Sequence, residues 1–271
     1  SLGDHFGVGH IFLAGEAPGL FYGYVTQGIV QKEDITENGI KYIKQDGSVG
    51  YYQTVNKTTP VAGDVKYVDR NGDGVVDDND RDISGPEGKP DGVVDTNDRT
   101  VIGNPFPDFT YGFQTKVSWK SLSLSASFNG VQGRDILNVG NRYNNTPGTK
   151  SNNVTRKAFQ NMWTDENPSN LYPKSTFVVQ NMVMDRYVED GSYLRCSDIT
   201  LSYVLPAKWT NKIGIKNTSV YASVKNAFVI TDYSGYDPEV NSFAFDGLRP
   251  GVDMNSYPTP RSFVFGLNLT F

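Results

Sequence analysis

The sequence predicts an all-β protein in which antiparallel strands cross a membrane as part of a β-barrel and are joined by long extracellular loops. Three observations lead to this fold class. Five segments alternate between apolar and polar residues, these segments are unusually long, and their connections alternate between short and long. The composition of the 271 residues agrees, because 28 Gly and 14 Pro favour turns while 16 Tyr, 15 Phe and 3 Trp favour strands.

Charge and reactive residues exclude several classes of protein. With 25 Lys+Arg against 30 Asp+Glu the net charge is -5, whereas a nucleic-acid-binding protein normally has a basic face, so we expect no nucleic acid partner. No apolar run approaches the roughly 18 residues that a membrane-spanning helix needs. The single cysteine, Cys196, excludes an internal disulfide framework, and His5 and His10 leave little room for histidine-based catalysis.

The segment Arg261–Phe271 has the clearest strand pattern. Every second residue is apolar and the residues between are small or polar, with Val264 as the exception. The apolar residues are Phe263, Phe265, Leu267, Leu269 and Phe271. Because side chains alternate between the two faces of a strand, this segment is predicted to have one strongly apolar face.

Four further segments show the same alternation, and they are Phe109–Trp119, Leu122–Gln132, Thr218–Val229 and, less cleanly, Ser192–Leu205. Leu20–Gln31 is a sixth candidate. Each has about 10 residues or more, the length of a tilted strand in a bilayer, whereas strands of soluble sandwiches have about 5 or 6. Five or six strands cannot close a barrel of the smallest usual size, about 8 strands. Either further strands lie within the long loops or the rest of the barrel lies upstream, and we favour the second explanation.

The connections predict the orientation of the strands. Lys120–Ser121 is a two-residue turn, Gly133–Gly191 is very long, Pro206–Asn217 is shorter and Ile230–Pro260 is long again. Outer-membrane barrels alternate short periplasmic turns with long external loops in this way. If Phe271 is periplasmic, the Lys120–Ser121 turn falls on the same side. A soluble β-sandwich would show the same alternation of residues, but strand length and loop asymmetry favour the barrel.

An acidic loop, Asp69–Asp80, reads D-R-N-G-D-G-V-V-D-D-N-D and matches the spacing of an EF-hand loop. Its oxygen ligands would be Asp69, Asn71, Asp73, the Val75 carbonyl, Asp77 and Asp80, with Gly74 at the sharp turn. Hard oxygen donors suit Ca²⁺. Aspartate replaces the usual glutamate at the last position, which brings the loop closer to the dockerin type. We expect a structural Ca²⁺; the alternative is a cluster of Asx and Gly turns without metal.

Part of this loop is repeated 18 residues later, where Asp91–Arg99 copies Asp73–Arg81. A second, weaker site would use Glu87, Asp91, Asp95 and Asp98. Lys89 stands at its third ligand position, and an ammonium group cannot bind a cation. For the copy, a turn without metal is therefore favoured. Together the two motifs define an acidic region at residues 64–104.

Several blocks, in order along nearly the whole chain, resemble the SusC/RagA family, the TonB-dependent outer-membrane transporters of Bacteroidetes. The blocks are Pro18–Tyr24, Gly28–Gln31, Gly63–Tyr67 leading into Asp69–Gly74, Asp98–Phe113, Trp163–Pro168, Val188–Arg195, Asn226–Phe228, Tyr233–Glu239 and Tyr257–Arg261.

The resemblance implies a plugged barrel of roughly 22 strands in the bacterial outer membrane, of which residues 1–271 are the C-terminal portion. The plug and the segment that recruits the TonB complex would lie upstream. The expected partners are a SusD-like surface lipoprotein, an oligosaccharide or peptide substrate, and outer-membrane lipid. Phe271 resembles the signal for barrel assembly. The sequence begins at Ser1 and shows no signal peptide, so we expect that a signal was removed or that this is an internal piece of a longer polypeptide.

Import of oligosaccharides or peptides is the predicted function, with loop aromatics as candidate substrate contacts: Tyr143, Tyr233, Tyr236 and Phe243. The alternative is a soluble, calcium-stabilised β-domain that binds carbohydrate or protein at the cell surface. An enzyme is disfavoured. The carboxylate pairs Asp237 with Glu239 and Glu189 with Asp190 have no spacing that places them across a cleft, so we expect no catalytic residues.

Overall fold

The computed structural model divides the chain into two compact units. It describes residues 9–13, 15–44, 46–70, 93–94, 96–146, 153–175, 182–210, 215 and 217–270. Unit 1 comprises Ser1–Pro105, Ile136–Glu189 and Asn241–Asn255. Unit 2 comprises Phe106–Asp135, Asp190–Val240 and Ser256–Phe271.

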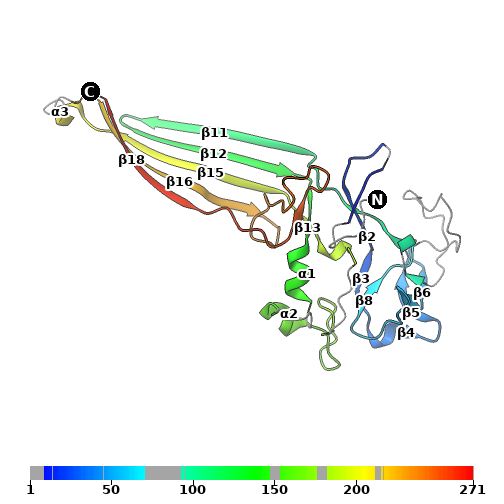
Figure 1. The fold of residues 1–271 in the computed structure, drawn as a ribbon. Coiled ribbons are helices and arrows are strands. Elements are labelled where there is room, and N and C mark those ends of the chain that lie inside the picture. The colour runs from blue at the N-terminus through cyan, green and yellow to red at the C-terminus, as the bar shows by residue number, and fades with distance from the viewer. Residues whose placement is uncertain are drawn as a thin grey trace. The chain divides into compact units, whose positions relative to one another are not determined.

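Unit 2 is built on one antiparallel sheet of five long strands in the order β11-β12-β15-β16-β18 (Figure 1). The strands are β11 (Phe109–Trp119), β12 (Leu122–Gln132), β15 (Tyr193–Val204), β16 (Asn217–Thr231) and β18 (Ser262–Thr270). All five strands predicted from alternation are confirmed. β11 and β12 begin and end at the predicted residues, and the other boundaries differ by one or two residues.

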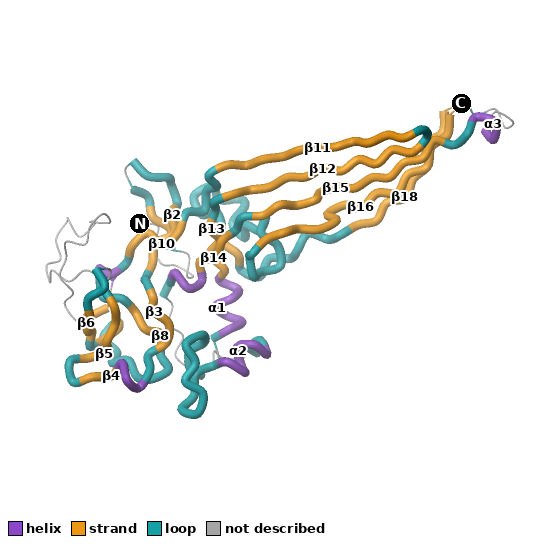
Figure 2. Tube along the Cα trace, turned by 180° about the vertical axis from the view of Figure 1, so that it is seen from behind, coloured by secondary structure: helices purple, strands orange, loops and turns teal. Residues whose placement is uncertain are grey.

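The short connections of this sheet lie at one end. Trp119 pairs with Leu122 across the two-residue turn, where Lys120 has a φ of 54°, as tight hairpin turns require. The connection between β15 and β16 contains the short helix α3 (Ala207–Thr210), which lies at the same end as the turn (Figure 2). This agrees with the alternation of short and long connections.

The two faces of the sheet differ in character because cross-strand partners are of the same kind. One row of paired residues is apolar: Val117, Leu124, Leu201, Ala222 and Phe265. The row one residue along, on the opposite face, is mostly polar: Lys116, Ser125, Thr200, Ser223 and Val264. Four of these apolar side chains are exposed, Phe265 to 79%, and Ala222 is partly buried. A large exposed apolar face of this kind is typical of a membrane or interaction surface.

A bulge explains why the alternation of Ser192–Leu205 is imperfect. Cys196 pairs with Phe128 and Asp198 pairs with Ser127, so Ser197 is an extra residue in β15. On the other side of β15, Cys196 pairs with Phe228 and Asp198 with Lys225. An extra residue reverses the faces of the residues that follow, which interrupts a pattern with a period of two.

Two tyrosines of the sheet pack over glycines directly opposite them. Tyr111 pairs with Gly130, and Tyr221 pairs with Gly266. A Cβ atom added to Gly130 or Gly266 would lie 2.3 Å or 2.2 Å from the ring Cζ atom of its tyrosine. The glycines are therefore needed for the close approach of the rings, and the rings cover backbone that glycine leaves open.

The strands of unit 1 form small sheets. Their orders are β1-β2-β10, β3-β8, β4-β5-β6, β7-β9 and β14-β13-β17. The strands of the first part of the chain are β1 (His10–Ile11), β2 (Leu20–Gly23), β3 (Thr26–Ile29), β4 (Ile35–Thr36), β5 (Gly39–Ile43), β6 (Val49–Tyr52) and β7 (Thr54–Val55). The later strands are β8 (Val65–Tyr67), β9 (Val93–Val94), β10 (Thr100–Gly103), β13 (Asp135–Asn138), β14 (Val188–Asp190) and β17 (Val252–Asp253).

The prediction of one long strand at Leu20–Gln31 is wrong. The segment divides into β2, which pairs with β1 and β10, and β3, which pairs with β8. Between them the Tyr24 N–H donates to the Val183 carbonyl at 2.9 Å, and the backbone N–H and the hydroxyl of Thr26 donate to Asp185. Contacts with a segment far along the chain therefore break the strand.

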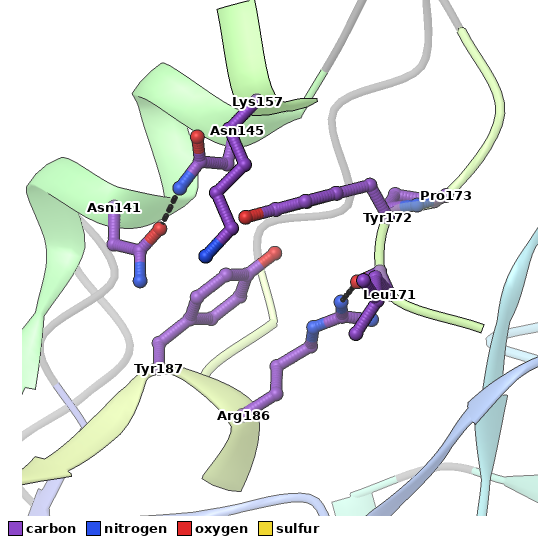
Figure 3. A pocket seen from close by; sticks show the side chains of 8 residues that line it. All are labelled: Asn141, Asn145, Lys157, Leu171, Tyr172, Pro173, Arg186 and Tyr187. Carbon is purple, nitrogen blue, oxygen red and sulfur yellow. Dashed lines mark hydrogen bonds between the residues drawn. The ribbon is translucent and has the colours of Figure 1, made fainter. Parts of the chain in front are cut away.

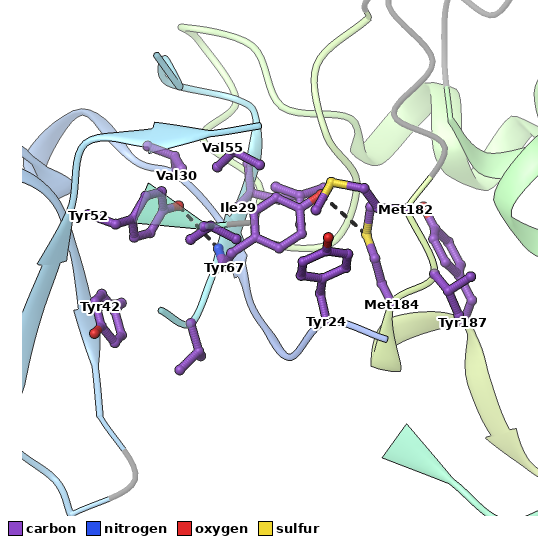
Figure 4. Packing of buried hydrophobic residues seen from close by; sticks show 14 of the residues in the cluster. Tyr24, Ile29, Val30, Tyr42, Tyr52, Val55, Tyr67, Met182, Met184 and Tyr187 are labelled. Carbon is purple, nitrogen blue, oxygen red and sulfur yellow. Dashed lines mark hydrogen bonds between the residues drawn. The ribbon is translucent and has the colours of Figure 1, made fainter. Parts of the chain in front are cut away.

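The core of unit 1 is rich in tyrosine (Figure 4). The Tyr67 N–H donates to the Tyr52 hydroxyl at 3.1 Å, and the Tyr67 hydroxyl points at the Met184 sulfur at 3.6 Å. The Tyr24 and Tyr67 rings meet edge to face, with centroids 5.9 Å apart. Buried tyrosine needs a partner for its hydroxyl, and these contacts supply one.

Three separate parts of the sequence hold this core together. The Trp163 indole donates to the Gln31 side chain at 3.0 Å, and the Ile29 N–H donates to Asn170 at 2.7 Å. Leu137 pairs in parallel with Val252. Both long connections of the unit 2 sheet thus fold into unit 1. Within the described residues, no helix has the length and apolar character needed to cross a membrane.

Candidate functional site

Unit 1 contains a cavity of about 200 Å³ lined mainly by polar side chains (Figure 3). The lining side chains that carry its chemistry are two carboxamides, two cations and two phenols: Asn141, Asn145, Lys157, Arg186, Tyr172 and Tyr187. All lie in residues 136–189, the first long connection of the unit 2 sheet.

Short capped helices position half of this lining. Asn141 and Asn145 lie on α1 (Val139–Asn145), where the Asn138 side chain accepts from the Asn141 N–H at 2.8 Å. Lys157 lies on α2 (Arg156–Asn161), where the Thr155 hydroxyl accepts from the Ala158 N–H at 3.1 Å. Asn and Thr are preferred at helix N-termini because their side-chain oxygens satisfy backbone N–H groups there.

The other polar lining residues come from a short turn and from an extended segment. Arg186 and Tyr187 belong to η4 (Asp185–Tyr187), and Tyr172 lies in a stretch in which the Trp163 N–H donates to the Tyr172 carbonyl at 3.0 Å. Figure 3 shows the hydroxyls of Tyr172 and Tyr187 and the Lys157 ammonium directed toward the same space.

A hydrogen-bond network orients the carboxamides. The Asn141 amide nitrogen donates to Glu189 at 2.9 Å, and the Asn145 amide nitrogen donates to the Asn141 oxygen. The Asn145 oxygen in turn accepts from the Thr155 hydroxyl at 2.6 Å. Each amide therefore has a defined direction in which its remaining hydrogen and lone pair can bind a ligand.

The cavity has an excess of positive charge. Neither Lys157 nor Arg186 forms an ion pair with a carboxylate in the described part of the chain. The Arg186 Nη2 atom donates to the Leu171 carbonyl, while its Nη1 atom is buried without a hydrogen-bond partner. The guanidinium lies 5.7 Å from the centroid of the Tyr187 ring. Because the lining holds two cations and no acidic side chain, it favours binding of an anionic acceptor group.

Sequence reasoning missed this cavity. Its residues come from helices and turns inside a connection that was predicted only as a long loop, and their side chains have no recognisable spacing. The asparagine-rich run that contains Asn138, Asn141 and Asn145 was the one available signal.

The four aromatic residues predicted to contact substrate lie in different environments. Tyr143 and Phe243 are partly buried against the unit 1 core, and the Arg249 guanidinium lies 4.5 Å from the centroid of the Phe243 ring. In unit 2, Tyr233 is buried at 5% exposure and Tyr236 is 72% exposed. Of these four residues, only Tyr236 exposes most of its side chain to solvent. Substrate binding by these residues stays a prediction.

A buried ion-pair network in unit 2 holds the carboxylates Asp237 and Glu239. Arg195 donates to Asp237 at 2.5 Å and lies 3.4 Å from Glu239, which also accepts from the Tyr193 hydroxyl at 2.6 Å. Burial opposes ionisation of Asp237, but hydrogen bonds from Glu239 and Thr259 and the charge of Arg195 outweigh it, so the pKa of Asp237 is lowered. This carboxylate pair is engaged in fixing the loop.

Two of the predicted calcium ligands lie among the described residues, and both are buried: Asp69 at 1% and Asp98 at 0% exposure. The Arg70 N–H donates to the Asp98 carboxylate at 2.6 Å, and the Tyr42 hydroxyl donates to the Asp69 carbonyl at 2.8 Å. The first position of the first motif and the last position of its copy therefore lie in one neighbourhood. Burial, followed by the charges of Asp69 and Asp98, raises the pKa of Tyr42.

The other predicted ligands lie outside the described residues. They are Asn71, Asp73, Val75, Asp77, Asp80, Glu87, Asp91 and Asp95, and Phe271 is also outside. Among the residues that are described, no group of three His, Cys, Asp or Glu side chains is arranged to hold a metal ion. The carboxylates of Asp69 and Asp98 are the hard oxygen donors that Ca²⁺ prefers, so the described residues fit this ion in their chemistry.

The chain was compared with family models, with curated proteins and with solved structures. No family model matches the chain. The curated proteins and the solved structures give matches that agree with each other. TonB-dependent receptor P26 of Formosa agariphila is 33% identical over 219 residues, which cover 78% of this chain and 20% of the receptor. TonB-dependent receptor SusC of Bacteroides thetaiotaomicron is 32% identical over 212 residues, which cover 76% of this chain and 17% of SusC.

A solved structure of the RagAB peptide importer in its open-open state matches 98% of this chain and 25% of the importer chain, with a TM-score of 0.60 and 24% identity. This likeness shows that the fold is shared. The chain spans about a fifth of the length of the curated relatives it matches.

Proposed function

The chain is part of a TonB-dependent receptor of the SusC/RagA family, a protein of the outer membrane, and we propose that it supplies wall strands and extracellular loops to a nutrient transporter. The observation that carries this proposal is the five-stranded sheet with one exposed apolar face. Such a face is stable against lipid and would be unfavourable in water. It therefore argues against the soluble β-domain considered as the alternative.

The cargo that we propose is an oligosaccharide or a peptide. In support, the matched solved structure is described as a peptide importer, and a matched relative is the receptor SusC. We further propose that a SusD-like surface lipoprotein assembles with the extracellular loops and that the TonB complex drives import through a part of the protein upstream of this chain. We propose no catalytic role.

We also propose that the acidic region at residues 64–104 binds one structural Ca²⁺. Asp69 and Asp98 would hold it together with the motif residues between them, and the ion would supply positive charge that offsets the clustered carboxylates. Asp69 fixes the start of the loop through Tyr42, and Asp98 fixes its end through the Arg70 N–H.

The transport proposal is tested in the native organism with an antibody against residues 218–271. We expect an outer-membrane band several times heavier than 29.9 kDa, because the relatives are several times longer than this chain. A crosslinked surface lipoprotein should copurify with it. Uptake of a fluorescent oligosaccharide or peptide panel should fall in a deletion strain and in wild-type cells treated with a protonophore.

The control is a strain that carries the restored gene, which should recover uptake. A band near 29.9 kDa in a soluble fraction would contradict the proposal and favour the calcium-stabilised β-domain.

A further inference from the structure

We propose that the cavity lined by Asn141, Lys157, Tyr172, Arg186 and Tyr187 binds one carboxylate-bearing sugar ring of the transported oligosaccharide. This inference rests on the proposed transport function and deepens it, because it names a class of substrate: oligosaccharides that contain uronic acid residues. The argument has four steps, which concern size, charge, polar groups and rigidity.

The size of the cavity suits one ring. Its volume is about 200 Å³. An apolar protein cavity of about 150 Å³ holds a benzene molecule, so this cavity has room for one substituted six-membered ring and not for a longer segment. It therefore fits a single residue of a longer chain whose neighbours remain outside.

The charge of the cavity suits a carboxylate. Lys157 and Arg186 both line it, and in the described part of the chain neither is paired with an acidic side chain. The Leu171 carbonyl accepts a hydrogen bond from Arg186 Nη2, which holds the guanidinium in place. Two cations that line one cavity attract an incoming carboxylate, and a guanidinium and an ammonium group can each form a charge-assisted hydrogen bond with it.

The remaining polar groups favour a sugar over an acidic peptide side chain. Two carboxamides and two phenolic hydroxyls provide both donors and acceptors around the same space (Figure 3). Ring hydroxyls would satisfy them. The aliphatic stem of an aspartate or glutamate would leave these groups without partners, which costs binding free energy.

Rigidity favours binding because the site needs little reorganisation. Glu189, Asn141, Asn145 and Thr155 form a continuous hydrogen-bond chain, and the Arg186 guanidinium lies against the Tyr187 ring. Preorganised polar groups lose less conformational entropy when a ligand binds.

The test uses the purified full-length protein with its lipoprotein partner in detergent. Isothermal titration calorimetry compares short oligogalacturonates and oligoglucuronates with the same oligosaccharides after chemical reduction of their carboxyl groups. The reduced forms keep the ring and lose the charge. We expect the uronates to bind about tenfold more tightly or better, and the difference to shrink at high salt.

Two substitutions examine the cations separately. Lys157→Met should weaken uronate binding about tenfold and leave the reduced oligosaccharides unaffected, because a charge-assisted hydrogen bond is lost. Arg186→Lys keeps the charge and removes the planar donor pair, so it should also weaken uronate binding. The matched control is Lys32→Met, which removes an exposed lysine of unit 1 that pairs with Asp165 at the surface.

Three results would overturn the inference. They are equal affinity for uronate and reduced oligosaccharides, absence of binding to both, and tighter binding of a Glu-containing peptide than of its Gln counterpart with loss of that preference in Lys157→Met. The last result would assign the cavity to acidic peptides. If purified protein binds uronates but the deletion strain imports them normally, the transport proposal fails and the cavity assignment stands.

Discussion

His10 is a buried histidine of unit 1, and its contacts help to hold the first described residues in place. Its ring is 2% exposed and its Nε2 atom lies 3.0 Å from the Pro250 carbonyl, while its Nδ1 atom is buried without a hydrogen-bond partner. Burial lowers the pKa of His10 from its ordinary value of 6.5, and the charge of Arg249 lowers it further. The bond to Pro250 and the charge of Asp246 oppose this change without reversing it.

The lowered pKa predicts a pH dependence. Below about pH 6.5, His10 is protonated in the unfolded segment but stays neutral in the folded segment until the pH reaches the lowered pKa. The free energy that stabilises the folded segment is therefore fully present above about pH 6.5 and declines as the pH falls toward the lowered pKa. The loss approaches about 1.4 kcal/mol per pH unit in that window. Hydrogen exchange of residues 9–23, corrected for the intrinsic rate, should be faster at about pH 5.5 than at about pH 7.5.

Two variants serve as controls for this prediction. His10→Gln keeps a donor for the Pro250 carbonyl and cannot titrate, so its corrected exchange should be the same at both pH values. His5→Gln should behave like the wild type. Equal protection of wild-type residues 9–23 at both pH values would rule out the assigned role of His10.

At the scale of elements, the apolar face of the unit 2 sheet predicts a contrast between neighbouring residues of β18. Phe265 lies on the apolar face and pairs with Ala222, whereas Val264 lies on the polar face and pairs with Ser223. Phe265→Lys should reduce the folded protein in the outer membrane, because a lysine on the lipid face near the bilayer midplane costs about 2–4 kcal/mol. Val264→Lys should have a small effect.

The measurement is the amount of full-length protein that migrates as a folded barrel on gels of unheated outer membranes. Since the two residues are adjacent, membrane depth is nearly the same and the face of the sheet is the main difference. Equal loss in both variants would mean that β18 does not separate lipid from a polar interior.

At the scale of the whole molecule, the acidic region predicts a dependence on calcium. An ion that binds only the folded state at about 100 times its dissociation constant stabilises it by about 2.7 kcal/mol. Thermal unfolding of the purified full-length protein should therefore occur at a higher temperature in CaCl₂ than in EDTA. Asp69→Asn and Asp98→Asn should each reduce this difference.

Asp46→Asn is the matched control for the calcium experiment. Asp46 is an exposed acid of unit 1 that is not among the predicted ligands, and its carboxylate accepts from the Ser48 N–H at 2.9 Å. Its replacement should leave the calcium effect unchanged. If the unfolding temperature of the wild type is the same in CaCl₂ and in EDTA, the acidic region is a set of turns without metal.

The sequence by itself determined the five-stranded sheet of unit 2. The five strands and the Lys120–Ser121 hairpin could be predicted because alternation and tight turns are local properties, readable from neighbouring residues. The alternation was imperfect at Ser197, where a bulge adds a residue, and misleading at Leu20–Gln31, where Asp185 and Val183 break the strand from far along the chain.

Only the tertiary structure decided how the connections fold. The cavity joins residues of α1, α2, η4 and the segment around Tyr172, and Asp69 and Asp98 come together from opposite ends of two motifs. Neither arrangement has a periodic signature, because each depends on hydrogen bonds and core packing between residues distant in sequence. Residue types and spacing predict which chemistry is available, whereas long-range packing decides which of these groups meet.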